Sequence, residues 1–322
     1  MRLATVIFAA AGVVLLAPSS LLAQAPRLPQ RQARDDPPEP CPYCGRSPSA
    51  PEGRRGLHWH AHWNRVGALE YVLTPALLGI GVAFNFLVRP AGDANWTGPA
   101  LFDSPVRDAV AFDSDDARRA AQVTSDALLV GSVAHTMLVD PVLVAWAGRG
   151  SRDTAWQMLV INAQAYALTL SLNAITKRVV ERERPWADRC AVEPDGEDCS
   201  SRARYVSFYS GHAAITATSA ALVCAHHTQL KLYGSELADS LTCVGALTFT
   251  AATGVLRISS DNHWATDVLA GHLIGYASGY LIPTLRFYKE FRATPEPDDH
   301  ARFTVLPWLG SSSFGAHLLG RL

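Results

Sequence analysis

The sequence predicts an all-α protein, a helical bundle of about six apolar helices. Apolar residues make up 48% of the 322 residues, and the mean hydropathy is +0.07. That value is high for a soluble protein but low for a chain made mostly of membrane spans. From Trp63 onward the apolar residues lie in runs with the length of helices rather than strands. The runs cover residues 66–88, 125–147, 154–177, 212–228, 238–256 and 267–287.

The N-terminus has the pattern of an export signal. Arg2 precedes the apolar core LATVIFAAAGVVLLA, and SSLLAQA supplies small residues for cleavage, which we expect after Ala23. Residues 1–23 would then be a signal peptide, and an uncleaved anchor is the alternative. The mature chain would lie outside the cytoplasm, where disulfides are allowed.

The segments that flank the helices are predicted to lack a core. Residues 24–62 form a proline-rich flexible arm, because eight prolines lie between residues 24 and 57 without an apolar period. The helical domain spans residues 63–292, with an acidic, irregular connection at 89–124. The tail, residues 293–322, is expected to hold a short hairpin around Ser311 to Ser313.

Charge and hydropathy limit the kinds of partner that the protein is expected to have. The 28 basic and 29 acidic residues nearly cancel, so no global field favours nucleic acid or an anionic membrane surface. The runs at 66–88 and 154–177 are long and apolar enough to span a membrane. Asp140 and Pro141 make the run at 125–147 the weakest candidate span, because an unpaired charge is costly in a membrane. His135, Asp140 and His272 would suit a buried bundle equally well.

Three polar clusters interrupt the apolar runs. The first is KRVVERERP, in which Lys177 and Arg184 are seven residues apart. On a helix that spacing puts both cations on one face, and Pro185 is expected to end the helix at Arg184. Taken alone, this cluster could be a charged helix end that complements the helix dipole.

The second cluster, YSGHAAITATS, opens an apolar helix. Ser210 can cap the free amides of the helix start, and Gly211 suits a tight turn. A helix N-terminus also attracts anions, because its amides and dipole point outward. His212 can give or take a proton near neutral pH, which favours chemistry on an anion.

The third cluster, RISSDNHWATD, contains Arg257, His263 and Asp267. His263 and Asp267 are four residues apart, so on a helix the carboxylate can reach the imidazole. An acid that holds one ring nitrogen fixes the tautomer and makes the other nitrogen a better base or nucleophile. A polar helix start with a local His–Asp pair is the simpler interpretation.

Together, Lys-x6-Arg-Pro, Ser-Gly-His and Arg-x5-His-x3-Asp resemble the type 2 phosphatidic acid phosphatase family. The resemblance covers roughly residues 120–287. That family shares its helical fold and site with vanadium-dependent haloperoxidases and soluble bacterial acid phosphatases. The resemblance therefore implies a helical bundle with a phosphate site at helix ends.

The resemblance also implies a role for each matching residue. Lys177, Arg184 and Arg257 would surround the phosphate oxygens, and Ser210 with the Gly211 amide would add donors for the transition state. His263 would attack phosphorus, Asp267 would orient it, and His212 would protonate the leaving oxygen. Three cations already neutralise the anion, so no metal and no cofactor are expected.

Two departures from the family pattern stand next to these residues. The family usually has Pro before Ser-Gly-His, where this chain has Tyr209. In the third motif, Leu256 and Asp261 replace the usual Ser and Gly. The carboxylate of Asp261 could alter phosphate affinity or clamp an arginine.

These features predict a metal-independent phosphatase that acts on phosphate monoesters or diphosphates, with lipid phosphates as favoured partners and no nucleic acid. A phosphohistidine would form on His263. The alternatives are a haloperoxidase that holds vanadate as cofactor, a soluble periplasmic non-specific acid phosphatase, and a non-enzymatic bundle with a relic site. We expect a membrane-associated envelope protein whose site faces the periplasm, or else a soluble periplasmic bundle.

The cysteines give further expectations. Cys190 and Cys199 flank a loop between the first two motifs and are predicted to form a disulfide at the lip of the site. Cys224 and Cys243 lie in apolar helices, where free buried thiols are the default. Cys41 and Cys44 with His58, His60 and His62 match a loose zinc pattern, but the segment between them has little to form a core, so no metal site is expected.

Overall fold

The computed structural model describes residues 56–90, 93–192, 199 and 201–289, together with the backbone of two strands in the tail. β1 (Arg302–Leu309) and β2 (Phe314–Arg321) pair antiparallel in the segment where the sequence predicts a hairpin. The turn at 310–313 lies outside the described residues, as do the expected signal peptide, Cys41, Cys44 and most of the expected arm.

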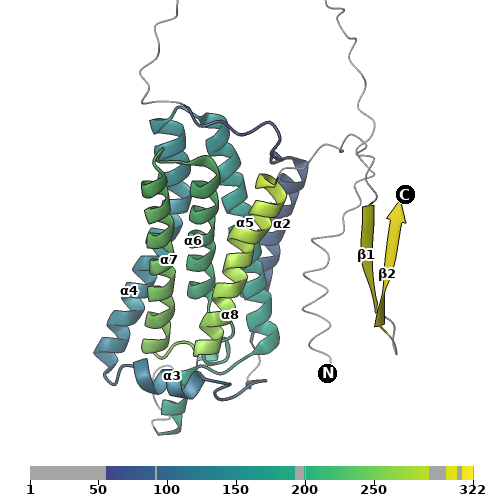
Figure 1. Cartoon of the computed structure of the whole chain (residues 1–322). Helices are drawn as coiled ribbons and strands as arrows, with labels where there is room; N and C mark the ends of the chain where they lie inside the picture. The colour runs from purple at the N-terminus through teal and green to yellow at the C-terminus, as the bar shows by residue number, and fades with distance from the viewer. Residues whose placement is uncertain are drawn as a thin grey trace, which may run out of the picture. The chain divides into compact units, whose positions relative to one another are not determined.

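The described domain is the predicted all-α bundle (Figure 1). The first helix is slightly shorter than its predicted run of 66–88, the other five extend beyond their predicted ends, and the helices alternate in direction along the bundle (Figure 1). The long helices are α2 (Ala68–Phe86), α4 (Asp115–Ala134), α5 (Arg152–Val180), α6 (Gly211–Leu230), α7 (Glu236–Ser259) and α8 (Ala265–Tyr276). Helix α4 continues as η1 (His135–Gly148), and α8 continues as η4 (Ala277–Leu281) and η5 (Thr284–Tyr288).

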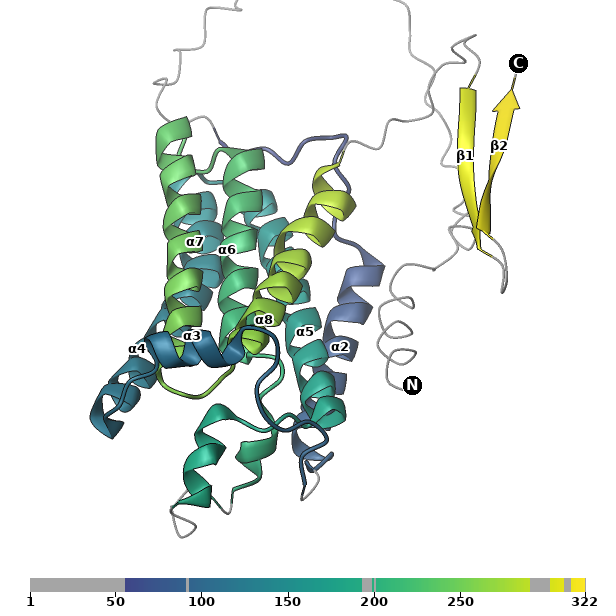
Figure 2. The same ribbon diagram turned by 60° about the horizontal axis from the view of Figure 1, so that its bottom comes forward.

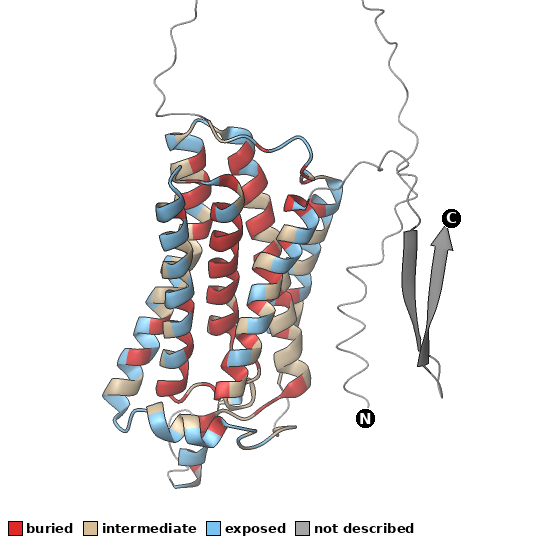
Figure 3. Cartoon of the chain, in the orientation of Figure 1, coloured by how far each residue is buried: buried red, intermediate tan, exposed pale blue. Residues whose placement is uncertain are grey.

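Helix α6 lies at the centre of the bundle. Sixteen of its 20 residues are buried, and Figure 3 shows it as an almost continuous red helix among mixed neighbours. A helix that is covered on all sides needs no polar face, which explains why its Ala, Ser and Thr residues show no amphipathic period. The small side chains instead let the surrounding helices approach closely.

Helix α8 and its continuation η4 approach α6 along three glycines spaced four residues apart. A Cβ on Gly271, Gly275 or Gly279 would lie 2.6, 2.2 or 2.4 Å from the nearest backbone oxygen of α6 or its cap. Only hydrogen fits at these distances, so the spacing of the two helices depends on this glycine stripe. We call Gly271, Gly275 and Gly279 the α8 glycine stripe.

Five helical segments are long and apolar enough to cross a membrane: Ala68–Phe86, Asp115–Gly148, Arg152–Val180, Glu236–Ser259 and Ala265–Tyr288. Their outer faces expose many large apolar side chains, among them Val72, Phe86, Val130, Leu138 and Leu273. Apolar surface on this scale is typical of a membrane-associated protein rather than a soluble bundle.

The run at 125–147 lacks the unpaired charge for which we expected it to be the weakest candidate span. Its helix contains an 18-residue window with a mean hydropathy of 1.8, the highest value among the five segments. Asp140 is buried, but it is not isolated: Oδ2 lies 3.4 Å from His227 Nε2 and 3.6 Å from His135 Nδ1. Pro141 follows in the π-type segment η1, whose wider turns accommodate a residue without an amide hydrogen.

The connection at 89–124 is more ordered than predicted. It contains α3 (Asp103–Val110) and the first turns of α4, which Ser114 caps by accepting a hydrogen bond from the Ala117 amide. Figure 2 shows α3 lying across the ends of α7 and α8. Two short 3-10 helices, η2 (Pro185–Ala191) and η3 (Arg202–Tyr205), lie in the connection between α5 and α6.

The described chain enters and leaves the bundle at the end opposite to α3. The rings of Trp59 and Trp63, which precede α2, lie 5.3 and 4.8 Å from the ring of Tyr288 at the end of η5. From there α2 runs parallel to α5: Trp156 donates to the hydroxyl of Tyr71 near the start, and Arg178 donates to the carbonyl of Val88 beyond the end.

A disulfide joins Cys224 of α6 to Cys243 of α7, with 4.7 Å between the Cα atoms. The prediction of free thiols at these positions is therefore wrong. The two helices are antiparallel neighbours, and the pairing depends on which turns face each other. An apolar sequence context carries no information about that alignment.

Candidate active site

Lys177 and Arg184 reach the same end of the bundle by different routes. Lys177 lies in the last turn of α5, but the helix ends at Val180, because Glu181 takes a left-handed conformation with φ of 45°. Arg184 is extended rather than helical, so the predicted shared helix face is wrong. Its guanidinium donates to the carbonyls of Ala203 and Asn262 at 2.8 and 2.9 Å, which fixes it beside the α7–α8 turn.

The Ser-Gly-His motif begins α6 as predicted. The Ser210 hydroxyl accepts a hydrogen bond from the Ala213 amide at 3.4 Å, and the Ser210 amide donates to the Asp267 carbonyl at 3.1 Å. A Cβ on Gly211 would lie 3.0 Å from the side-chain oxygen of Asn173 on α5, so glycine fits this close approach. The helix start is thereby held against both α5 and α8.

Tyr209 replaces the usual family proline without disturbing this start. Its side chain is fully buried and its hydroxyl donates to the Thr169 carbonyl at 3.3 Å. Its own carbonyl accepts a hydrogen bond from Asn173 at 2.9 Å. Tyr209 therefore anchors the residue before the motif to α5.

His212 points to a carboxylate that the sequence did not single out. Nε2 of His212 lies 2.7 Å from Oδ1 of Asp126 on α4, and the same oxygen lies 3.6 Å from Nη1 of Arg257. Arg257 also donates to the hydroxyl of Ser125 at 3.3 Å. Asp126 thus links the predicted general acid to one of the predicted phosphate ligands.

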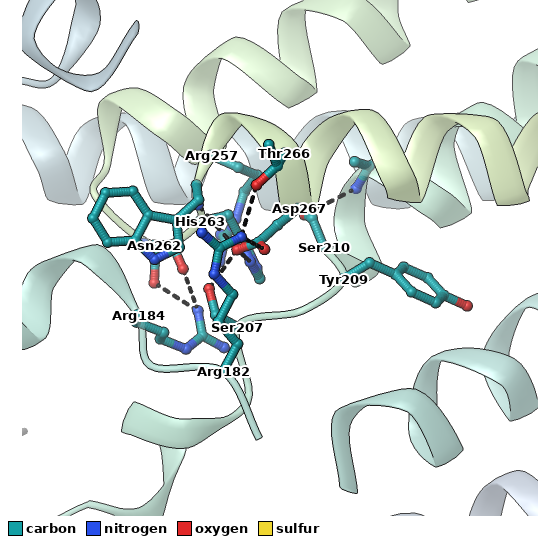
Figure 4. A network of polar contacts seen from close by, with 12 residues as sticks. Arg182, Arg184, Ser207, Tyr209, Ser210, Arg257, Asn262, His263, Thr266 and Asp267 are labelled. Carbon is teal, nitrogen blue, oxygen red and sulfur yellow. Dashed lines mark hydrogen bonds and ion pairs between the residues drawn. The ribbon is translucent and has the colours of Figure 1, made fainter. Parts of the chain in front are cut away.

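His263 and Asp267 are neighbours, but only Asp267 is helical (Figure 4). His263 lies in the turn before α8, and its Nδ1 is 3.6 Å from Oδ2 of Asp267, longer than a hydrogen bond. The same carboxylate oxygen accepts from the Ser207 hydroxyl at 2.5 Å and from the Trp264 amide at 3.0 Å. Asp267 is therefore firmly oriented, with Oδ2 as the carboxylate oxygen that faces the imidazole.

A buried ion-pair network holds Asp267 through Oδ1, the carboxylate oxygen that does not face His263. Arg182 is fully buried and donates to Oδ1 of Asp267 and to Oδ2 of Asp103, both at 2.6 Å. Its guanidinium lies 3.9 Å from the centre of the Trp96 ring. Thr266 bonds to Asp103 through its amide and hydroxyl, both at 2.8 Å. Burial raises the pKa of Asp103, but the hydrogen bonds from Thr266, Arg182 and the Ala100 amide outweigh it and lower the pKa.

Asp261 clamps arginines, as one of the two sequence alternatives proposed. It has a φ of 60°, in the left-handed region where the family has glycine. Its carboxylate accepts from Nε of Arg107 at 2.7 Å and from Nη1 of Arg189 at 3.1 Å. These arginines come from α3 and η2, so Asp261 fastens both segments to the α7–α8 turn.

The predicted disulfide between Cys190 and Cys199 is present, with 5.6 Å between the Cα atoms. It lies in the connection that carries Arg184 to the site, together with Trp186 and Ala187. Among the described residues no group of His, Cys, Asp or Glu has the arrangement of a metal site. His58, His60 and His62 are exposed before α2.

The predicted residues therefore gather at one end of the bundle around His263. Burial lowers the pKa of His263 well below 6.5, and the charges of Arg184, Arg257 and Lys177 lower it further. The imidazole is consequently neutral at pH 7, with a lone pair available for attack. Cations and donors around a neutral histidine can bind an anion and hold it against a nucleophile.

This electrostatic arrangement predicts the pH dependence of the site. Because the neutral form persists below pH 6.5, we expect the acid limb of any His263-dependent rate to lie below that value. Arg184→Met removes a nearby positive charge, so it should raise the pKa of His263 and move the limb to higher pH. The check is kcat/KM against pH for both proteins on one substrate, whose own ionisation cancels. A limb that stays in place would contradict the electrostatic explanation.

Comparison with known proteins agrees with the sequence prediction. Residues 155–291 match the model of the PAP2 superfamily. A phospholipid phosphatase-related protein type 1 of Mus musculus is 32% identical over 100 residues, which are 29% of this chain and 30% of the relative. A lipid A 1-phosphatase of Porphyromonas gingivalis is 29% identical over 175 residues, which are 53% of this chain and 34% of the relative. The chain thus spans about a third of the length of these curated relatives. No solved structure matches it significantly.

Proposed function

Residues 155–291 of this chain belong to the PAP2 superfamily, and from that premise we propose that the protein is a metal-independent phosphatase of lipid phosphate monoesters or diphosphates. The observation that carries the proposal is that Lys177, Arg184 and Arg257 lie close enough to the buried His263 for their charges, after burial, to lower its pKa. Their charges match those of a phosphate group. The neutral imidazole among them is the nucleophile that such a substrate requires.

In the first step Nε2 of His263 attacks phosphorus, and an N–P bond forms as the P–O bond to the leaving group breaks. Asp267 faces Nδ1 and stabilises the positive charge that develops on the ring. His212 gives its proton to the leaving oxygen, while the α6 N-terminus at Ser210 and Gly211 stabilises the pentavalent transition state.

In the second step water attacks the phosphohistidine. His212, now neutral, takes a proton from this water, and the N–P bond breaks to release inorganic phosphate and restore His263. Burial and the charge of Arg257 lower the pKa of His212 to about 4, and Asp126, whose Oδ1 lies 2.7 Å from Nε2, opposes this shift by favouring the protonated form that donates. Lys177 and the two arginines neutralise the phosphate charge in both steps.

Lipid substrates are favoured because the site lies at the end of helices whose outer faces are apolar. A lipid held in a bilayer can present its phosphate at that level without leaving the membrane. The printed names of the two relatives also refer to phospholipids and lipid A. The Cys190–Cys199 disulfide at the catalytic end supports an oxidising compartment, and we place the site on the periplasmic side.

The test is phosphate release in EDTA, with phosphatidate, undecaprenyl diphosphate, phosphatidylglycerol phosphate and a soluble aryl phosphate as substrates. We expect His263→Ala to lower kcat at least about 10³-fold, because the nucleophile is lost. His58→Ala, an exposed histidine near the start of α2, is the matched control and should keep full activity. Folded wild-type protein that releases no phosphate from any substrate would contradict the proposal, as would undiminished release by His263→Ala.

A further inference from the structure

An apolar groove runs down the side of the bundle between α7 and α8. Ala217 of α6 forms its floor, Leu247 and Thr250 of α7 form one wall, and the segment from His272 to Leu281 forms the other. Its volume is about 510 Å³. Leu273 and Leu281 are 65% and 51% exposed, so the groove opens sideways, on the surface that faces lipid in a membrane.

The groove begins next to the catalytic end and follows the same helices away from it. His272 lies five residues after Asp267, so at 1.5 Å per residue the groove starts roughly 7 Å from the level of Asp267. It then extends for about 14 Å to Leu281, a length that suits an extended acyl chain. A chain in this groove would leave its headgroup at the level of His263.

One polar atom in this groove has no partner. Nε2 of His272 is buried and has no hydrogen bond within the described part of the chain. The ring also bonds to the backbone of Thr250. Because Nε2 is unpaired, we assign that bond to Nδ1; donation from Nδ1 to the Thr250 carbonyl leaves Nε2 as an acceptor. A buried acceptor among apolar side chains is unfavourable until a ligand supplies an O–H or N–H.

We propose that this groove binds a chain of the lipid substrate and that His272 selects lipids with a hydroxyl or amide N–H close to the headgroup. The inference rests on the proposed phosphatase function and narrows its substrate class. A diacylglycerol phosphate has only ester linkages at that depth and cannot donate. A phosphorylated lipid with an amide-linked or hydroxylated chain can.

The first experiment fills the groove. Ala277→Trp places an indole among the lining residues, and Ala251→Trp places the same side chain on the exposed face of α7 outside the lining. We expect Ala277→Trp to lower kcat/KM for long-chain lipid phosphates at least about tenfold, while a soluble aryl phosphate changes less than about twofold. Ala251→Trp should change neither. Equal effects of the two variants on lipid substrates would contradict the proposal that the groove binds the lipid chain.

The second experiment tests His272 with ceramide 1-phosphate, which has an amide N–H and a hydroxyl, and phosphatidate of matched chain length, which has neither. We expect wild-type protein to prefer ceramide 1-phosphate by roughly three- to tenfold in kcat/KM, and His272→Phe to abolish the preference. The 3-O-methyl derivative keeps the N–H alone and identifies which group donates. If the wild-type protein hydrolyses the aryl phosphate but does not prefer ceramide 1-phosphate over phosphatidate, the inference about His272 is refuted and the phosphatase function is not. If the wild-type protein hydrolyses none of the substrates, both are refuted.

Discussion

Arg182→Met is expected to destabilise the protein by about 3–5 kcal/mol, the cost of breaking a buried ion pair from one side. Methionine fills much of the same volume, but it leaves the carboxylates of Asp103 and Asp267 buried without their shared cation. Thermal unfolding in detergent should therefore shift down by about 10 °C or more. Phosphatase activity should fall as well, because Asp267 loses the contact that orients it toward His263.

Two further variants test whether the loss of stability comes from breaking the buried network or simply from removing one positive charge. Arg65→Met breaks an exposed pair with Asp153 and should cost less than about 1 kcal/mol. Adding Asp103→Asn to Arg182→Met removes one stranded carboxylate and should restore part of the lost stability. An Arg182→Met protein as stable as Arg65→Met would show that the network contributes nothing.

Gly275→Ala is expected to destabilise the bundle by about 1–3 kcal/mol or more, because its Cβ would lie 2.2 Å from the Ala214 carbonyl oxygen. Helices α6 and α8 must then separate, and α8 begins at the catalytic turn, so activity should fall in parallel. Gly79→Ala is the matched control, since no atom lies within 4 Å of its added Cβ. There, helix propensity alone should stabilise the protein by roughly 0.5–1 kcal/mol. Equal unfolding temperatures for the two variants would contradict the close packing.

The helices could be predicted because long apolar runs are a local signal, but their ends could not. Helix α5 stops at Val180 through the left-handed Glu181, and nothing in VVERERP marks that residue as a stop. Lys177 and Arg184 were expected together for the wrong reason, a shared helix face. They meet because the chain turns back after α5. The motif therefore identified the right residues but not the backbone conformation that brings them together.

Residues that act through distant partners were missed. Arg182 looked like part of a charged helix end, and only the fold brings it between Asp103 and Asp267. Asp126 lies in a polar stretch of α4, 86 residues from His212. The α8 glycine stripe was visible as a four-residue spacing in the sequence, and a search for small residues at that interval would have found it.

The direction of α2 determines on which side of a membrane the ends of the domain lie relative to the site. The described chain enters α2 beside Tyr288, and after α2, α4, α5, α6, α7 and α8 it leaves at that same end, opposite His263. In a bilayer crossed by these helices, Gly56 and Lys289 therefore lie on one side and the phosphate on the other. A site that faces the periplasm places Gly56 in the cytoplasm, which is incompatible with export of the preceding arm after cleavage at Ala23. A reporter fused at either position would thus record the side opposite to catalysis.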